Sequence, residues 1–573
     1  MNKKTNAIPQ NSTSSLSWFL LILLLAVAAW CTRYWLSPEF GLYEDDLTFI
    51  PQAIEADFPG VLSMVTEYFS TLAEQGRPFM WSWVVLLGHL GWQLGGLQGM
   101  YYLAYTVWMI NILLFIFLLW RVHKQFLFVS LAGLAYVLFS ADTNQAFLFN
   151  AFGLQTALIF LLSACHLYLL KNKWHWLAYF FLVLVMLNYE TPFWLFMAAP
   201  LLTELNGKAL KRRLIINAVL MIVIFLLVYF LRLSVGESRV TGLGFADMII
   251  TPFKHMLIGP FVGLGVYGLR PILVLGNLSP GLLIAVLSSA VIFYIGLNWI
   301  VNRNPSSVSG LFSFGKGWWT NLDMQTKREL RLLFAGLIML VFAYPLTVIL
   351  RPYAISGRET RVHMAAVVGA ALILASLLTL LFRAVHERRK SQMTFLVLLS
   401  LIFGFNFAFG FMIQDDYRHA WDLQKSFWRE LLILIPDVED GTAVLVEPSG
   451  LEDVLYIDAN TWNLPRVLPQ LFVFPDEWER EPKVFRLVDN WQNQLLRLPG
   501  YFTVDILTSF SPLPTYGDYP QSKAIFISTQ NGELERRFEP LPLQEMVDMK
   551  PMGQDILQTF DTRPLYDLMI QED

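Results

Sequence analysis

Three consecutive acidic residues, Glu44, Asp45 and Asp46, follow an N-terminal apolar run. Adjacent carboxylates repel one another, so we expect at least one raised pKa and a tendency to hold a proton or a cation. Such a carboxylate can take the proton of a hydroxyl group as its oxygen attacks. A pair can also hold a divalent ion, Mg²⁺ or Mn²⁺. The alternative is that Asp45 or Asp46 only caps a helix suggested by the apolar residues from 49 to 54.

Arginines form the second group of candidates. Arg77 precedes a proline and an aromatic, glycine-rich segment, 79–97, while Arg358 and Arg361 lie three residues apart and share one face of a helical turn. Planar guanidinium groups suit a phosphate, so all three are candidate phosphate ligands. The alternatives are that Arg77 reaches to a lipid phosphate, and that Arg358 or Arg361 pairs with Glu359.

Further polar residues, at the ends of apolar runs or within the segment 233–280, are candidates for the wall of a cavity. They are Tyr189, Glu190, Lys254, His255 and His363. For His363 a packed helix histidine is the simpler interpretation, and the others can equally be polar ends that reach out of an apolar layer.

Composition indicates where these residues must be placed. Of the 573 residues, 55% are hydrophobic and 15% are charged, and the mean hydropathy is +0.49. Soluble domains carry about 25% charged residues. The chain is therefore expected to be a polytopic membrane protein with an all-α membrane domain. This composition excludes a disordered chain and a nucleic-acid binder, and two cysteines cannot form a disulfide scaffold.

About 20 apolar residues are needed to cross a bilayer. The apolar runs predict eleven spans, at 17–36, 99–120, 125–140, 151–170, 174–189, 192–206, 213–232, 281–302, 331–350, 362–383 and 394–413. Most Lys and Arg residues then lie on the side of the N-terminus, which is typical of the cytoplasmic side. Residues 1–16 are expected to be a disordered cytoplasmic end, 37–98 and 233–280 to be outer loops, and 79–97 to be an interfacial or re-entrant element.

Composition changes after residue 413. Residues 414–573 carry 28 acidic and 13 basic residues, whereas residues 1–413 carry 17 and 28. We expect 414–573 to be a mixed α/β domain outside the cytoplasm. It begins with an amphipathic helix near 423–432 and contains a strand at 442–446. A hairpin of 523–528 and 534–538 around Asn531-Gly532 follows.

The layout of residues 17–413 resembles the GT-C superfold of membrane glycosyltransferases, in particular the protein mannosyltransferases and aminoarabinose transferases. The resemblance rests on four short matches: Asp45-Asp46-Leu47-Thr48-Phe49, Arg77-Pro78-Phe79, Tyr189-Glu190, and the basic pair Arg358 and Arg361. The His-Pro step that is frequent after the third span in this superfamily is replaced by Ser140-Ala141-Asp142-Thr143-Asn144.

The resemblance implies transfer of a sugar, with inversion, from a polyprenyl-phosphate carrier to a glycan, lipid or protein outside the cytoplasm. Asp45 would then be the base, with Asp46 as its neighbour or a metal ligand, and the arginines would bind the donor phosphate. The implied partners are the lipid-linked sugar and membrane lipid, in a bacterial inner membrane. A polymerase or ligase of lipid-linked glycans, a flippase or transporter, and a scaffold that binds a partner through its tail are the alternatives.

Overall fold

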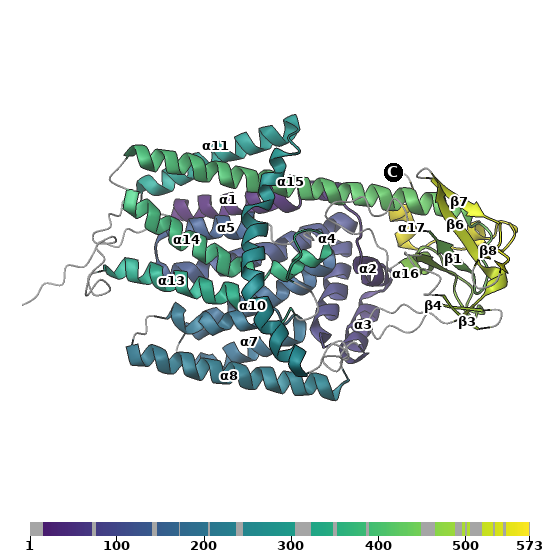
Figure 1. The fold of residues 1–573 in the computed structure, drawn as a ribbon, viewed down its shortest axis with the longest axis horizontal. Helices are drawn as coiled ribbons and strands as arrows, with labels where there is room; N and C mark the ends of the chain where they lie inside the picture. Colours follow the sequence, from purple (N-terminus) through teal and green to yellow (C-terminus); the bar gives the residue numbers. More distant parts are fainter. Residues whose placement is uncertain are drawn as a thin grey trace, which may run out of the picture.

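The computed structural model describes residues 15–71, 76–139, 146–170, 172–203, 207–236, 245–303, 322–347, 352–385, 389–447, 464–486, 495–498, 501–504, 518–530, 533–542 and 546–571. A bundle of long helices forms one end of the molecule and a smaller domain with β-sheets forms the other, with helix α15 running between them (Figure 1). The expected fold class of a helical membrane domain followed by a sheet-containing C-terminal region is confirmed at this level.

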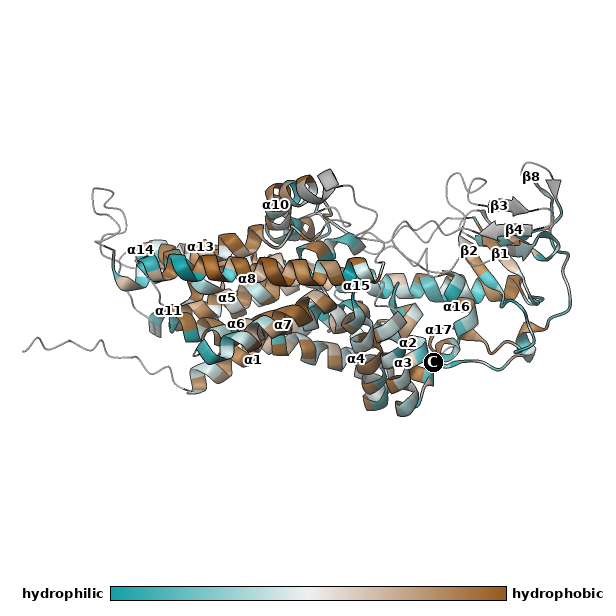
Figure 2. Cartoon of the chain, turned by 90° about the horizontal axis from the view of Figure 1, so that it is seen from below, coloured by the Kyte–Doolittle hydropathy of each residue, from teal (hydrophilic) through white to brown (hydrophobic). Residues whose placement is uncertain are grey.

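The bundle consists mainly of α-helices, with some 3₁₀ and π turns. Its helical elements are α1 (Ser15–Arg33), η1 (Ser37–Glu39), α2 (Asp46–Glu55), α3 (Phe58–Thr71), α4 (Pro78–His123), α5 (Phe126–Leu138), η3 (Asn150–Leu154), α6 (Gln155–Tyr168), η4 (Asn172–Trp174), α7 (His175–Asn188), η5 (Phe193–Leu202), α8 (Gly207–Ser234), α10 (Phe245–Gly268), η6 (Arg270–Leu275), α11 (Pro280–Arg303), α13 (Met324–Val341), η7 (Arg358–His363), α14 (Ala366–Val385) and α15 (Arg389–Leu434). Within the described residues, eight helices are long and apolar enough to cross a membrane, so the count of eleven spans stays a prediction. Figure 2 shows hydrophobic residues along the bundle helices, α8 most clearly, and more hydrophilic residues in the half of α15 that enters the C-terminal domain.

Helix α4 contains a sharp break that separates the segment 79–97 from the span expected after it. Gly95 and Gly96 have non-helical backbone angles, and Gly96 has a φ of +60°, which a side chain would disfavour. The two halves pack tightly, since a Cβ on Gly99 would lie 2.2 Å from the carbonyl oxygen of Gly91. The first half contacts α2 and α3. It is therefore a helix of its own, and its expected interfacial or re-entrant position stays a prediction.

The segment 233–280, expected as an outer loop, contains helix α10. Its length and composition would allow a span. However, α10 runs across the neighbouring helices rather than along them (Figure 1). Two prolines, Pro252 and Pro260, and several glycines interrupt its pattern, which is why the sequence suggested a loop. In the segment expected as a span at 192–206, the described residues 192–203 contain the ten-residue 3₁₀ helix η5.

Helix α15 has 46 residues and extends about 69 Å. The last expected span and the amphipathic helix expected near 423–432 are therefore one continuous helix. In the domain that follows, β1 (Ala443–Val446) pairs in parallel with β2 (Lys483–Arg486) and β6 (Ile525–Gln530). Strand β6 pairs antiparallel with β7 (Glu533–Arg537), so both arms of the predicted hairpin are confirmed. Its turn, 531–532, lies outside the described residues.

The remaining elements of this domain are short. They are α16 (Leu464–Leu471), β3 (Leu495–Leu498), β4 (Tyr501–Val504), β5 (Asp518–Pro520), η9 (Gln521–Lys523), β8 (Leu541–Pro542), β9 (Met546–Val547), η10 (Leu557–Thr559) and α17 (Pro564–Met569). Strands β3, β4 and β5 form a second sheet, and β8 pairs with β9.

Candidate functional site

The acidic triplet is buried at the start of α2. Glu44 is 2% exposed and has a φ of +49°, a left-handed conformation that is unfavourable for a side chain with a Cβ. Such strain is found preferentially at functional sites. Asp45 is 5% exposed and precedes the first residue of α2, but its side chain makes no capping hydrogen bond to that helix. The helix-cap alternative is therefore wrong for Asp45.

Asp46 binds the beginning of another helical segment. Its Oδ1 accepts a hydrogen bond from the backbone N–H of Phe149 at 2.7 Å, and its Oδ2 accepts from the N–H of Leu148 at 3.0 Å and of Tyr43 at 3.4 Å. Burial raises the pKa of Asp46 to about 8 against the opposing effect of these three N–H groups, and the charge of Asp45 adds to the rise. This agrees with the expected raised pKa in the triplet. Both oxygens of Asp46 are engaged with the backbone, so this side chain positions the loop.

Arg361, one of the predicted arginines, lies close to the acidic triplet. One of its terminal nitrogens, Nη1, lies 4.0 Å from Oδ2 of Asp45, and both side chains are largely buried. Helix η7, which carries Arg361, comes from the segment before α14. Arg358 begins the same helix, but its side chain lies outside the described residues, so its role as a phosphate ligand stays a prediction.

His363 is a packed residue of η7. Its Nε2 lies 2.8 Å from the carbonyl oxygen of Ala354, and its Nδ1 lies 2.9 Å from the hydroxyl of Tyr344. The packed-histidine interpretation therefore fits its surroundings better than a cavity role.

Arg77 and Glu190 form a buried ion pair. Nε and Nη2 of Arg77 donate to the two carboxylate oxygens of Glu190 at 3.0 and 2.5 Å, and the guanidinium also lies 4.3 Å from the ring centre of Tyr189. The Arg-Pro and Tyr-Glu motifs thus meet. Arg232 adds a second cation, 3.4 Å from Glu190, and donates to the carbonyls of Gly76 and Met186.

Lys254 and His255, two of the candidates for a cavity wall, lie on α10 and differ in exposure. Lys254 is exposed, whereas His255 is 3% exposed and its Nδ1 lies 3.1 Å from the hydroxyl of Thr347. The contact of His255 with Thr347 links α10 to the segment after α13 and does not involve the acidic triplet.

Sequence reasoning missed three features of this region. Arg232 ends an apolar run and was counted as part of a span. Asn150, 2% exposed, starts the π turn η3, and neither polar atom of its amide has a hydrogen-bond partner among the described residues. Aromatic rings of Phe49, Trp81 and Phe149 pack together, 4.3 Å apart for the first two. Of these three features, the π turn is the type that is frequent at functional sites, but no sequence signal predicts it.

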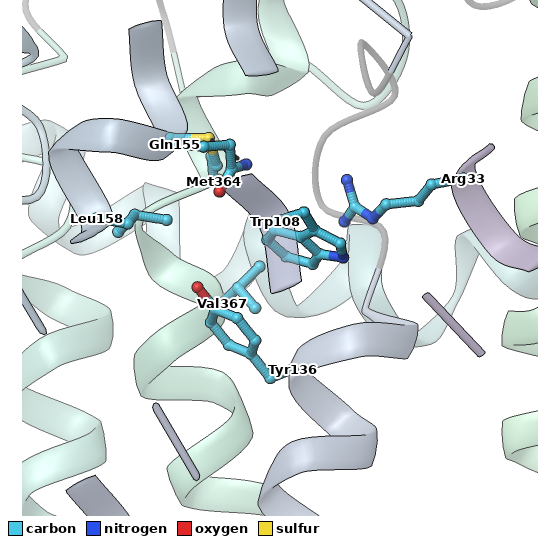
Figure 3. A pocket seen from close by; sticks show the side chains of 7 residues that line it. All are labelled: Arg33, Trp108, Tyr136, Gln155, Leu158, Met364 and Val367. Atoms are coloured by element: carbon cyan, nitrogen blue, oxygen red, sulfur yellow. Dashed lines mark hydrogen bonds between the residues drawn. The ribbon is translucent and has the colours of Figure 1, made fainter. Parts of the chain in front are cut away.

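A small cavity lies between α1, α4, α5, α6 and α14 (Figure 3). Its polar wall includes Arg33, Tyr136 and Gln155, and the guanidinium of Arg33 lies 4.1 Å from the ring centre of Trp108. With about 10 Å³ of space for the centres of water molecules, it can hold about one water. This is too little for a substrate.

The expected divalent ion has little support from the arrangement of carboxylates. Among the described residues, no three His, Cys, Asp or Glu side chains are grouped so that they could hold a metal ion. Asp46, the expected second ligand, already binds backbone N–H groups through both oxygens. The divalent ion between Asp45 and Asp46 therefore stays a prediction.

Comparisons of the chain with models of protein families, with curated proteins and with solved structures found no match. The functional assignment therefore depends on the geometry of the site and on the motifs in the sequence.

Proposed function

We propose that this chain is an integral-membrane glycosyltransferase that takes its sugar from a polyprenyl-phosphate carrier. The observation that supports this most is the proximity of Asp45 and Arg361, 4.0 Å apart and largely buried. A base for the acceptor and a cation for the leaving phosphate are the two groups that such a transfer requires. Both were singled out independently, from segments far apart in the sequence.

In the proposed reaction, the oxygen of the acceptor hydroxyl attacks the anomeric carbon while Asp45 takes the hydroxyl proton. The bond from that carbon to the carrier phosphate breaks on the opposite face, and the phosphate leaves with the electron pair, so one step inverts the configuration. Arg361 offers positive charge to the leaving phosphate and orients Asp45. Asp46 holds the loop through Phe149 and takes no part in proton transfer.

The proposal includes the topology. We place the N-terminus in the cytoplasm and the C-terminal domain on the other side of a bacterial plasma membrane, since basic residues concentrate on the side of the N-terminus. The transverse course of α10 is compatible with its position in an outer loop. The acceptor would then be a glycan, lipid or protein outside the cytoplasm.

Transfer from a panel of radiolabelled polyprenyl-phosphate sugars, in membranes that contain wild type, Asp45→Asn or Arg361→Ala, tests the proposal. We expect transfer by wild type from one donor and a loss of at least about a hundredfold in Asp45→Asn. Glu439→Gln, a matched loss of one carboxylate in the C-terminal domain, should keep full activity. Full transfer by Asp45→Asn at normal expression would refute Asp45 as the base. Carrier binding without transfer would favour a flippase or a ligase.

A further inference from the structure

Helix α2, which begins directly after Asp45, is fixed at both ends. At its first residue, Asp46 binds the backbone of Leu148 and Phe149. At its last residue, Oε2 of Glu55 accepts a hydrogen bond from Nη1 of Arg563 at 2.6 Å. The first contact lies within the bundle, whereas the second comes from the C-terminal domain.

Arg563 is itself held in place. Its backbone N–H donates to the carbonyl of Leu471 at 2.9 Å, and its Nε donates to the carbonyl of Phe472 at 3.0 Å. Leu471 ends α16, and Arg563 immediately precedes α17. Both short helices contact α2, and they lie next to it in the two views of the chain (Figures 1 and 2). One hydrogen bond therefore holds the guanidinium that meets Glu55 against the domain, and another holds the backbone of the same residue.

A second connection reaches the segment before Asp45. The ring of Trp421, on α15, covers Gly41 so closely that a Cβ there would lie 1.8 Å from it. The hydroxyl of Tyr43 donates to the carbonyl of Tyr417 at 2.9 Å. Because α15 continues into the C-terminal domain, this domain is connected to the chain on both sides of the acidic triplet.

We infer that Arg563 is a positioning residue, which through Glu55 fixes the orientation of α2 and with it the place of Asp45. The C-terminal domain then contributes to activity by orientation and need not contact the substrate. The catalytic part of this inference rests on the proposed function, whereas the mechanical part does not. Small misplacements of a catalytic group are costly, with about a hundredfold loss for a shift of 1 Å.

Hydrogen exchange of residues 46–55 in the full-length protein tests the mechanical part. Arg563→Glu places two acidic side chains opposite each other, so we expect exchange of these amides to rise by about three- to tenfold. Glu55→Gln should give a smaller rise, and Arg563→Lys should stay near wild type. Arg537→Glu is the matched control, because Arg537 is also 27% exposed but pairs with Glu535 within the sheet. Unchanged exchange in Arg563→Glu would overturn the inference.

Transfer kinetics test the catalytic part with the same variants. We expect kcat of Arg563→Glu to fall by about tenfold or more while KM for the donor changes by less than about twofold, with recovery in Arg563→Lys. A rise in exchange with unchanged kcat would refute the positioning role. Absence of transfer by wild type with every donor would instead refute the proposed function, and the exchange result would still decide whether Arg563 holds α2.

Discussion

Asp46 accepts the backbone N–H of Phe149 at 2.7 Å, in a contact between the start of α2 and the residue before the π turn η3. Its neighbour Asp45 is directed toward Arg361 instead. Two adjacent carboxylates thus have different partners, one from the backbone and one from a guanidinium. The sequence motif alone presents them as equivalent.

Loss of the Asp46 carboxylate should mainly affect folding. In Asp46→Ala the buried N–H groups of Leu148 and Phe149 lose their acceptor, at a cost of about 1–3 kcal/mol each. We expect a loss of about 2–5 kcal/mol in the free energy of unfolding, measured by thermal unfolding of the detergent-solubilised protein. Asp45→Asn is the comparison variant and should lose less, because Nη1 of Arg361 lies 4.0 Å from Asp45, beyond the distance of a hydrogen bond. Equal destabilisation of the two variants would contradict the division of roles.

The raised pKa of Asp46 should make the stability of the protein depend on pH. Its pKa is raised to about 8 in the folded protein, while an unfolded aspartate has a pKa of about 3.9. Between these values the folded state holds more protons, so stability is greatest at low pH and falls as pH rises, by up to about 1.4 kcal/mol per unit.

Unfolding temperatures at pH 5 and pH 8 measure this effect. Wild type should lose more stability between the two than Asp46→Asn, which cannot titrate there. An equal change in unfolding temperature of the two proteins between pH 5 and pH 8 would show that Asp46 is ionised at both pH values. Its three N–H donors would then outweigh the effect of burial on its pKa.

Much of this arrangement could be predicted from residue types and spacing. The apolar runs identified the helical bundle, and the composition change near residue 413 identified the second region. The continuity of α15 through this boundary was not visible, because a sequence of changing polarity can continue one helix when its backbone bonds are satisfied internally. Similarly, the prolines of α10 suggested a loop, although Pro252 and Pro260 lie within a helix.

Two glycines on α10 should be intolerant of a side chain. A Cβ on Gly263 would lie 2.2 Å from the hydroxyl oxygen of Tyr344, and a Cβ on Gly259 would lie 2.4 Å from its ring. We expect Gly263→Ala to destabilise the protein by about 1–3 kcal/mol through overpacking. Gly265→Ala, on the same helix with no atom within 4 Å of the added Cβ, should be neutral or stabilising by up to about 1 kcal/mol. Equal thermal stability of both variants would mean that α10 does not pack on Tyr344.

Asp437 connects α15 to the sheet of the C-terminal domain. Its carboxylate binds Arg536 at 2.5 Å, accepts the N–H of Gly553 and lies 3.5 Å from Nζ of Lys550. Burial acts to raise the pKa of Asp437, but these partners outweigh it and lower the pKa. Its stabilising effect is therefore present above the unfolded value of about 3.9 and is lost as pH falls through the lowered pKa.

Asp437→Asn should therefore lower the free energy of unfolding of the domain at pH 7 by about 3–5 kcal/mol, because Arg536 and Lys550 would be left facing a neutral amide. Limited proteolysis of the full-length protein reports this as faster cleavage within 437–571. Glu535→Gln, which alters an exposed pair in the same sheet, is expected to stay within about 0.5 kcal/mol of wild type. Unchanged proteolysis of Asp437→Asn would show that the junction is held by apolar packing.

The site itself was only partly predictable. Spacing identified the arginines, but the partner of each depends on contacts between distant segments, which no local pattern encodes. Arg77 was expected to bind phosphate and is bound by the carboxylate of Glu190. Arg232 was hidden in an apolar run, because a single cation at the end of a span is usual.

Glu190 stands between Arg77 and Arg232 in the place that an anionic group would take between two guanidinium groups. In Glu190→Gln the two cations face a neutral amide, so we expect the free energy of unfolding to fall by about 3–5 kcal/mol. The hydrogen bonds of Arg232 to the carbonyls of Gly76 and Met186 reduce this loss. Millimolar inorganic phosphate should then raise the unfolding temperature of Glu190→Gln more than that of wild type, because the anion can replace the carboxylate. Sulfate-free chloride buffer of equal ionic strength is the control. A variant as stable as wild type would show that the ion pair contributes nothing, and an equal response to phosphate would show that Arg77 does not bind this anion.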